Sequence, residues 1–296
     1  MSSMAGETGT TDTRLPAETA VGPVRLIAAD AELLRSYYER AIGLRTLESS
    51  AKAVVLGAGS RPLVELVPTP GAPPRPAGTT GLFHLAILVP GRPELARALR
   101  RVLDAAERFT GASDHIVSEA LYLRDPEGNG IEIYHDRPRE EWSWSNGQVA
   151  MDTLPLDVDA VMAELPADGG ANGMPEGTVI GHVHLNVSDL RSAEDFYATA
   201  LGFDVTARGY PGALFVSAGG YHHHLGLNTW SGPGAAPPPA GARGLGRFEI
   251  VLPAGSDLGE IVDRLEHAGA DPVHSDEGVV VSDPSRNRLL VRADGG

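Results

Sequence analysis

The chain has 296 residues, a length that predicts two domains or one large one. Hydrophobic residues at 42% and charged residues at 21% are typical of globular proteins and argue against a disordered or fibrous chain. The absence of cysteine excludes disulfides, thiolate metal sites and a cysteine nucleophile, and the formal net charge of −15 disfavours nucleic acid and anionic membranes as partners. Any bound metal must therefore have nitrogen and oxygen ligands.

The first 20 residues are rich in Ser, Thr, Gly and Glu and lack the apolar core of a signal peptide. No apolar run elsewhere approaches the roughly 18 residues that are needed to span a bilayer. We therefore expect a disordered, solvated tail at residues 1–20 on a cytoplasmic protein.

An internal repeat organises the rest of the chain. The segment that begins at Val24 recurs from Val183, and the segment that begins at Phe83 recurs from Phe248. Each segment opens with an apolar strand and continues with a helix whose apolar residues recur at 3.6-residue spacing. Three short β-prone runs follow each helix. The sequence therefore predicts four βαβββ modules and an α+β fold.

The four predicted modules lie at residues 21–68, 80–136, 178–230 and 245–293. Stretches rich in Pro and Gly separate the two modules of each half, as expected of linkers. The longest gap, at residues 147–177, is interpreted as a linker between a first domain region at 21–146 and a second at 178–296.

Four βαβββ modules in this order resemble the vicinal oxygen chelate superfamily, which includes glyoxalases, bleomycin-resistance proteins and extradiol dioxygenases. The resemblance implies that the modules pair into two incomplete, cup-shaped β-barrels. It also implies that metal ligands come from the first and last strands of paired modules. Because the members of this superfamily differ in their chemistry, the fold alone leaves the function open.

One segment narrows the resemblance. Residues 114–134, DHIVSEALYLRDPEGNGIEIY, resemble the signature of the extradiol ring-cleaving dioxygenases, and Ser113 is a departure from it. The matching positions are His115, Leu121-Tyr122, Asp125-Pro126, Gly128 and Glu132. The resemblance extends to two-domain catechol 2,3-dioxygenases. It implies an Fe(II) cofactor, with Mn(II) as the alternative, and an aromatic diol and O2 as substrates.

Alignment of the four modules on their opening and closing strands selects candidate metal ligands. The opening position holds Arg25, His84, His184 and Glu249, and the closing position holds Glu65, Glu132, Gly226 and Leu290. His84, Glu132 and His184 form a two-His, one-carboxylate set, which is expected of non-haem Fe(II). This distribution favours pairing of module two with three and of module one with four over pairing in chain order. His182 shares a face with His184, so its role as ligand or neighbour stays open.

Three further side chains are candidate catalytic groups. The resemblance implies proton-transfer and hydrogen-bonding roles for His115 and Tyr122. In the His run at 222–224, strand alternation places His222 and His224 on one face. We predict His224 as the acid/base partner of His115, because an unperturbed imidazole titrates near neutral pH. The role of His222 stays open.

The sequence thus predicts a non-haem Fe(II) extradiol dioxygenase that acts on a catechol-type ring with O2. Two alternatives stay open. One is a glyoxalase-like metal-dependent lyase or isomerase, although Gly226 stands where a second carboxylate would be expected. The other is a metal-free small-molecule binding or resistance protein. Homo-oligomer formation also stays open.

Overall fold

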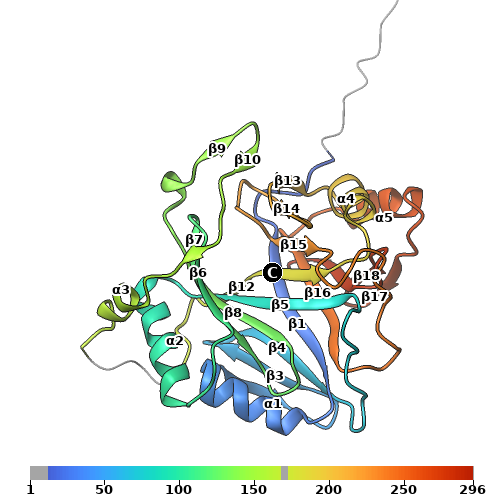
Figure 1. Ribbon diagram of the computed structural model, residues 1–296. Helices are drawn as coiled ribbons and strands as arrows, with labels where there is room; N and C mark the ends of the chain where they lie inside the picture. Colours follow the sequence, from blue (N-terminus) through green and yellow to red (C-terminus); the bar gives the residue numbers. More distant parts are fainter. Residues whose placement is uncertain (1–12, 168–172, 296) are drawn as a thin grey trace, which may run out of the picture.

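The computed structural model describes residues 13–167 and 173–295. Two large curved β-sheets form the centre of the molecule, and the helices lie at its periphery (Figure 1). A continuous apolar core connects the two sheets with the inner faces of the helices. Among the described residues, no helix combines the length and the apolar character that crossing a membrane requires.

The first sheet has eight strands in the order β17-β18-β19-β16-β1-β4-β3-β2. Their bounds are β1 Ala20–Ala28, β2 Arg45–Ser49, β3 Val54–Ala58, β4 Arg61–Pro68, β16 Gly244–Leu252, β17 Val273–Ser275, β18 Gly278–Ser282 and β19 Arg288–Ala293. These strands come from modules one and four.

The second sheet has nine strands in the order β11-β6-β7-β8-β5-β12-β15-β14-β13. Their bounds are β5 Gly81–Leu88, β6 Gly111–Asp114, β7 Ser118–Arg124, β8 Gly130–Asp136, β11 Leu154–Pro155, β12 Val179–Asn186, β13 Asp204–Ala207, β14 Ala213–Ser217 and β15 Leu225–Asn228. Eight of these strands come from modules two and three. A separate hairpin consists of β9 (Trp144–Ser145) and β10 (Gln148–Val149).

One helix follows the opening strand of each module, and a further helix, α3, follows β11. The helices are α1 Ala31–Tyr37, α2 Arg92–Asp104, α3 Val158–Ala163, α4 Leu190–Glu194 and α5 Leu258–His267, with a 3-10 turn at Arg139–Glu141. In modules one and three the helix continues as a π-helical turn, at Tyr38–Ile42 and Asp195–Ala200. Four of the helices begin at an Asp whose carboxylate accepts a backbone N–H of the first turn, which satisfies a donor that the helix leaves unpaired.

The predicted α+β class and the four βαβββ modules are confirmed, as is the crossed pairing of modules. β5 pairs antiparallel with β12, and β1 pairs antiparallel with β16. Module two therefore continues into module three in one sheet, and module one continues into module four in the other. Each sheet draws on both halves of the chain.

Two segments differ from the sequence-based expectation. The predicted linker at 147–177 contains β11, which adds to the edge of the second sheet, and α3, which contacts α2. Part of the predicted solvated tail is packed: Leu15 is buried, and its N–H donates to the carbonyl of Gly202. Residues 1–12 of that tail lie outside the described residues.

Two tyrosines connect the sheets at equivalent places. Tyr38, in the π-helical turn of module one, donates its hydroxyl to Asp125 of module two at 3.3 Å. Tyr197, in the matching turn of module three, donates to Asp283 of module four at 3.0 Å. Each Asp also accepts backbone N–H groups of its own loop. Both loops lead into the closing strand of their module.

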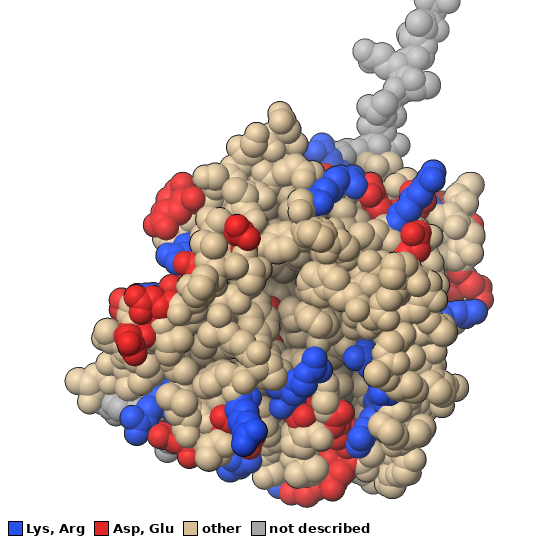
Figure 2. Space-filling view, in the orientation of Figure 1, with Lys and Arg blue, Asp and Glu red and all other residues tan. Residues whose placement is uncertain are grey.

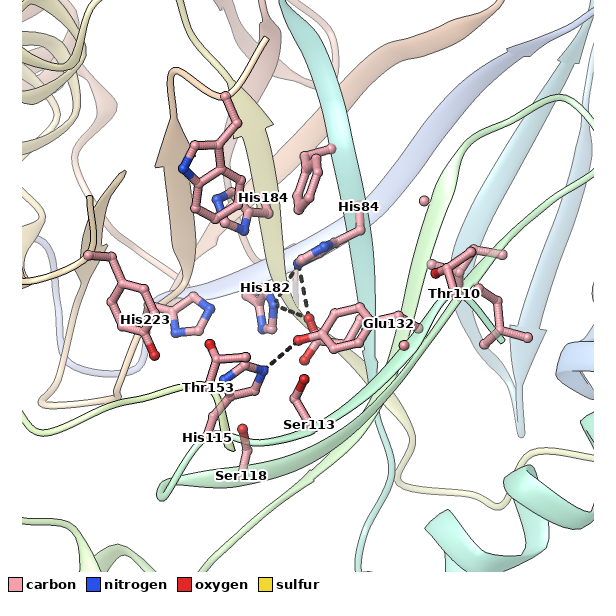
Figure 3. A pocket seen from close by; sticks show the side chains of 18 of the residues that line it. His84, Thr110, Ser113, His115, Ser118, Glu132, Thr153, His182, His184 and His223 are labelled. Atoms are coloured by element: carbon pink, nitrogen blue, oxygen red, sulfur yellow. Dashed lines mark hydrogen bonds and ion pairs between the residues drawn. The ribbon is translucent and has the colours of Figure 1, made fainter. Parts of the chain in front are cut away.

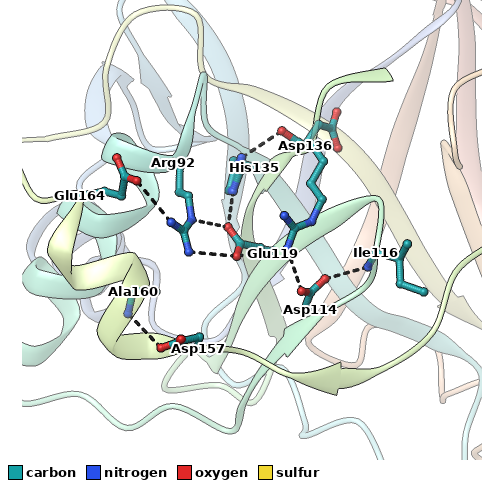
Figure 4. Close-up of polar contacts among 10 residues, drawn as sticks. Arg92, Asp114, Ile116, Glu119, His135, Asp136, Asp157, Ala160 and Glu164 are labelled. Carbon is teal, nitrogen blue, oxygen red and sulfur yellow. Dashed lines mark hydrogen bonds and ion pairs between the residues drawn. The ribbon is translucent and has the colours of Figure 1, made fainter. Parts of the chain in front are cut away.

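A buried polar cluster fixes β7 and β8 against α2 (Figure 4). The Glu119 carboxylate on β7 accepts from the Arg92 guanidinium at 2.7 and 3.2 Å, and it lies 2.7 Å from His135 Nε2 on β8. Arg92 also reaches Glu164, just after α3, at 3.3 Å. Arg137 adds a contact to Glu119 at 3.3 Å and one to Asp114 at 2.7 Å. The strand that carries Glu132 is thereby held in place along its neighbour.

Candidate metal centre and catalytic cavity

A cavity of about 390 Å³ lies within the curve of the second sheet. The space-filling view shows a hollow near the centre of the molecule, surrounded mainly by residues without formal charge (Figure 2). The lining comprises Phe83, His84, Thr110, Gly111, Ser113, His115, Ser118, Tyr122, Leu123, Arg124, Gly130, Ile131, Glu132, Met151, Thr153, His182, His184, Tyr210, Phe215, His223 and Trp230.

Three buried side chains converge in this cavity (Figure 3). The Nε2 atoms of His84 and His182 each lie 3.0 Å from Glu132 Oε2, and they lie 3.3 Å from one another. One ligand atom from each residue falls within 4.8 Å of the other two. Among the described residues, no other group of three His, Asp or Glu converges in this way.

The sheet register explains this convergence. Glu132 on β8 stands opposite Ala86 on β5, which stands opposite His182 on β12. These three residues form one row across the sheet, and the small side chain of Ala86 leaves the space between the other two open. His84 precedes Ala86 by two residues, so its side chain projects from the same face.

The environment favours the ionisation states that metal ligation requires. Burial lowers the pKa of His182 to about 4, which keeps its imidazole neutral at pH 7. Burial alone would raise the pKa of Glu132, but interactions with His182 and His84 hold it well below its ordinary value. His182 Nδ1 is buried and has no hydrogen-bond partner among the described residues. Two imidazoles and a carboxylate fit Fe(II) or Mn(II), which accept nitrogen and oxygen ligands.

The structure places His182, and not the predicted His184, in this group. The His184 ring lies edge-on to the His84 ring at 4.9 Å between centroids, and its Nε2 is buried without a partner among the described residues. On the paired strands, His84 is opposite His184 and Ala86 is opposite His182. A twofold axis between the strands superimposes the first pair on the second. His84 then coincides with His182, and His184 coincides with Ala86, so His182 is the counterpart of His84.

A signal for this assignment exists in the sequence. Gly91 precedes α2, and Asp189 precedes α4. The number of residues from His84 to Gly91 equals the number from His182 to Asp189. Alignment on the start of the helix would thus have selected His182. Alignment on Gly81 and Gly181 selects His184, but these two glycines are not equivalent: each strand has one irregularity in register, at Phe83 of β5 and at Gly181 of β12, so Gly181 corresponds to Phe83.

The predicted pair His115 and Tyr122 lies in the cavity wall, and the two side chains are hydrogen-bonded. His115 Nδ1 is 2.8 Å from the carbonyl oxygen of Asp152, which can only accept, so Nδ1 carries the proton. His115 Nε2 lies 2.6 Å from the Tyr122 hydroxyl. Burial raises the pKa of Tyr122 well above its ordinary value and keeps the hydroxyl protonated. The catalytic roles of both residues stay a prediction.

His224 does not line the cavity, contrary to the prediction, and His223 does. His224 Nδ1 accepts from the Ala218 N–H at 3.2 Å and lies 2.8 Å from Ser217 Oγ. The alternation on which the prediction depended begins only at Leu225, where β15 starts. Before it, Gly219 and Gly220 turn the chain with φ values of +62° and +65°, so residues 222–224 do not follow a strand.

Part of the cavity wall consists of aromatic side chains. Phe83 lies 5.1 Å from His184 and 5.2 Å from Trp230 between ring centroids, and Tyr210 lies 5.4 Å from Phe215. Met151 and Thr153 complete the wall from the segment that the sequence analysis interpreted as a linker. A planar, apolar ring fits such a wall because stacked and edge-on aromatic contacts are favourable.

The equivalent region of the first sheet contains ion pairs. Arg25 contacts Glu65 at 2.7 Å, and Glu249 accepts from Arg292 at 2.9 Å. Guanidinium groups occupy the positions that would surround a cation, so the two sheets have different roles.

Comparisons with known proteins agree with this architecture. The family model of the Glyoxalase/Bleomycin resistance protein/Dioxygenase superfamily matches residues 20–133 and 179–289. A protein named catechol-2,3-dioxygenase, from Bacillus subtilis (strain 168), is 42% identical over 277 residues, which span 92% of this chain and 96% of the relative.

Two solved structures share the fold. A crystal structure from Bacillus subtilis subsp. subtilis gives a TM-score of 0.65 at 13% identity, covering 96% of this chain and 87% of the other. Glyoxalase I from Zea mays gives 0.59 at 14% identity, covering 93% of this chain and 92% of the other. With the family model matching most of its length, this chain belongs to the Glyoxalase/Bleomycin resistance protein/Dioxygenase superfamily.

Proposed function

We propose that the protein is a metal-dependent extradiol dioxygenase that cleaves a catechol-type aromatic ring with O2. The observation that carries this proposal is the convergence of His84, Glu132 and His182 at the base of an aromatic-walled cavity. The relative named catechol-2,3-dioxygenase supports the same chemistry. We propose Fe(II) as the metal, with Mn(II) as the alternative.

The two imidazoles and the carboxylate would hold the metal on one side. When bound, such an ion supplies a redox-active Lewis acid with open positions for two substrate hydroxyl oxygens and for O2. In the overall reaction the carbon–carbon bond beside the diol breaks, and both atoms of O2 enter the ring-opened product.

The remaining cavity residues would bind and orient the substrate. The aromatic wall that includes Phe83, Phe215 and Trp230 would hold the ring, and this fixes which ring carbons lie beside the metal ligands. The hydrogen-bonded pair of His115 and Tyr122 would exchange a proton with the substrate hydroxyls, since both groups reach into the cavity.

The experiment is anaerobic reconstitution of the full-length protein with Fe(II) or Mn(II), followed by measurement of O2 uptake and ring-fission absorbance with catechols. We expect one metal per chain and a coloured product that is lost in His84→Ala and Glu132→Ala. Glu249→Gln, which changes a carboxylate of the first sheet, should keep turnover. Bound metal with no turnover of any catechol would contradict the dioxygenase proposal.

The site gives less support to the alternatives. A glyoxalase-like site with a second carboxylate would need a side chain at Gly226, but a Cβ there would lie 2.8 Å from the His184 ring. A metal-free binding protein would fail to retain metal after reconstitution, so the same experiment distinguishes it.

A further inference from the structure

A chain of hydrogen bonds leads from the end of β8 to the wall of the cavity. Asp136 Oδ1 lies 2.8 Å from His222 Nε2, and His222 Nδ1 lies 2.7 Å from His223 Nδ1. His223 is part of the cavity wall, where Figure 3 shows its ring near that of His182. The centroids of these two rings are 4.1 Å apart.

The Asp136 carboxylate determines which group donates at each hydrogen bond of the series Asp136–His222–His223. An ionised carboxylate only accepts, so the Nε2 of His222 donates to Asp136. A neutral His222 then has its lone pair on Nδ1, and the Nδ1 of His223 must donate to it. The Nε2 of a neutral His223 is consequently unprotonated. No described residue has a hydrogen bond to that nitrogen, and the ring faces the cavity.

The middle of the chain is rigidly mounted. The His222 side chain is fully buried, with Trp142 at 5.1 Å and Tyr221 at 4.1 Å between ring centroids. Its backbone carbonyl accepts from Thr206 Oγ1 at 2.7 Å. Tyr221 also donates its hydroxyl to Asp136 at 3.3 Å. These contacts fix the imidazole in the one orientation that connects Asp136 to His223.

Strand β8 carries both a candidate metal ligand and the carboxylate that contacts His222, on one face. Glu132 and Asp136 are four residues apart on β8, so both project toward the cavity side of the sheet. Glu132 reaches the candidate metal ligands, and Asp136 reaches the His222–His223 pair.

We propose that Asp136 and His222 are positioning residues that fix the tautomer of His223, so that its unprotonated Nε2 accepts a hydrogen bond from a hydroxyl of the bound molecule. The identity of that molecule as a catechol rests on the proposed function, whereas the tautomer does not. If the tautomer of His223 were not fixed, its Nε2 could be either a donor or an acceptor in the cavity. The Nδ1-protonated tautomer has an acceptor at Nε2, which suits a ligand that carries hydroxyl donors.

The first measurement is the tautomer of His223 in the full-length, metal-free protein at neutral pH. Histidine is labelled with ¹⁵N, and the signals are assigned with a His223→Gln variant. We expect wild-type His223 to be protonated at Nδ1 only. Protonation at Nε2, or at both nitrogens, would overturn the proposal without the need for any variant of His222.

Variants of His222 test the cause. His222→Leu removes both hydrogen bonds and should release His223 into a mixture that includes the Nε2-protonated form. His222→Gln should preserve the Nδ1-protonated form, because an amide can accept from His223 and donate to Asp136. Tyr221→Phe is the matched control: it removes a buried donor to Asp136 that lies off the path to His223, and it should leave the tautomer unchanged.

Turnover of catechol by the iron-loaded protein provides a second readout. Loss of a positioned hydrogen-bonding group should lower kcat at least about tenfold in His222→Leu while KM changes less than about threefold, and His222→Gln should recover most of kcat. An unchanged His223 tautomer in His222→Leu would contradict the proposal. If the wild type shows the expected tautomer but turns over no catechol, the positioning inference stands and only the proposed reaction fails.

Discussion

His182 and His184 lie on one strand and one face, yet only the His182 imidazole meets the Glu132 carboxylate. His184 is packed against His84, Phe215 and Trp230. Its ring fills the space beside Gly226 that a larger residue would occupy. We therefore propose His182 as a metal ligand, whereas His184 forms part of the wall of the cavity.

This assignment predicts unequal effects of two similar substitutions. His182→Asn should lower the affinity for Fe(II) at least about a hundredfold, because a ligand is lost. His184→Asn should retain affinity within about tenfold, since the three ligand atoms remain. Titration calorimetry under anaerobic conditions measures both. Equal or reversed effects would return His184 to the ligand set.

The sequence predicted part of this site for a physical reason. Glu132, His115 and Tyr122 are fixed by short-range spacing around one turn and its strands, so the signature was sufficient to place them in one cavity. His182 and His184 share a face, so strand alternation does not distinguish them, whereas the register of β12 against β5 and the distance to the following helix do. His223 could not be predicted from alternation, because the chain is irregular before β15 begins.

At the scale of elements, the polar cluster around Glu119 connects β7, β8 and α2 (Figure 4). Burial alone would raise the pKa of Glu119, but hydrogen bonds and charge from His135 and Arg92 lower it to about 2. A carboxyl whose pKa is lower in the folded state stabilises the fold above the pKa of the unfolded state. That contribution is lost as the pH falls toward 2.

Glu119→Gln should therefore lower the free energy of unfolding at pH 7 by on the order of 2 to 3 kcal/mol. Its stability should also vary less than that of the wild type between pH 4.5 and pH 2, because the titrating group is absent. Urea denaturation at several pH values tests this. Glu164→Gln is the control: this carboxylate is 47% exposed and contacts the same Arg92, so we expect a loss below about 0.5 kcal/mol.

The elements themselves were largely predictable. The helices have apolar residues at 3.6-residue spacing, which the buried faces of α2 and α5 confirm, and the strands are short β-prone runs bounded by turn residues. The short elements β11 and α3 were missed because each depends on a partner far away in the sequence. β11 is a strand only through its pairing with β6, and α3 contacts α2.

At the scale of the whole molecule, polar side chains connect the two sheets. Tyr38 and Tyr197 each donate a hydroxyl across from one sheet to a loop of the other. Because both acceptor carboxylates keep other donors, removal of one hydroxyl should be tolerated by the fold.

Tyr38→Phe and Tyr197→Phe should each lower the free energy of unfolding by about 1 kcal/mol, the usual value of one buried hydrogen bond. The double variant should lose the sum within about 0.5 kcal/mol, since the two sites share no partner. Chemical denaturation measures all three proteins. A double variant that unfolds in two separate transitions would show that the sheets are coupled mainly through these hydroxyls.

The charge of the molecule also predicts a substrate preference. The chain has a net charge of −15, the cavity contains the buried Glu132 carboxylate, and Arg124 is the one Lys or Arg of its lining. Arg124 is exposed and donates to the Gly128 carbonyl. A substrate carboxylate would thus enter without a buried cationic partner, which is unfavourable.

We expect kcat/KM for 4-methylcatechol to exceed that for 3,4-dihydroxybenzoate at least about tenfold, because the two differ at one position in charge and little in size. Steady-state O2 uptake measures both. The ratio should decrease as salt is added, since salt screens long-range repulsion. Equal efficiency with the two compounds would contradict this prediction.

The crossed pairing of modules also determines when the candidate metal centre can form. His84 and Glu132 belong to the first half of the chain, whereas His182 comes from the second. During synthesis, the ribosome must therefore release β12 before the third candidate ligand is available, and the chain as far as Trp230 before the cavity wall is complete. A nascent first half carries an unpaired β5 edge, which is a surface that its own later modules must cover. Two fragments divided between the halves would each lack a complete sheet, so metal binding would report their reassembly.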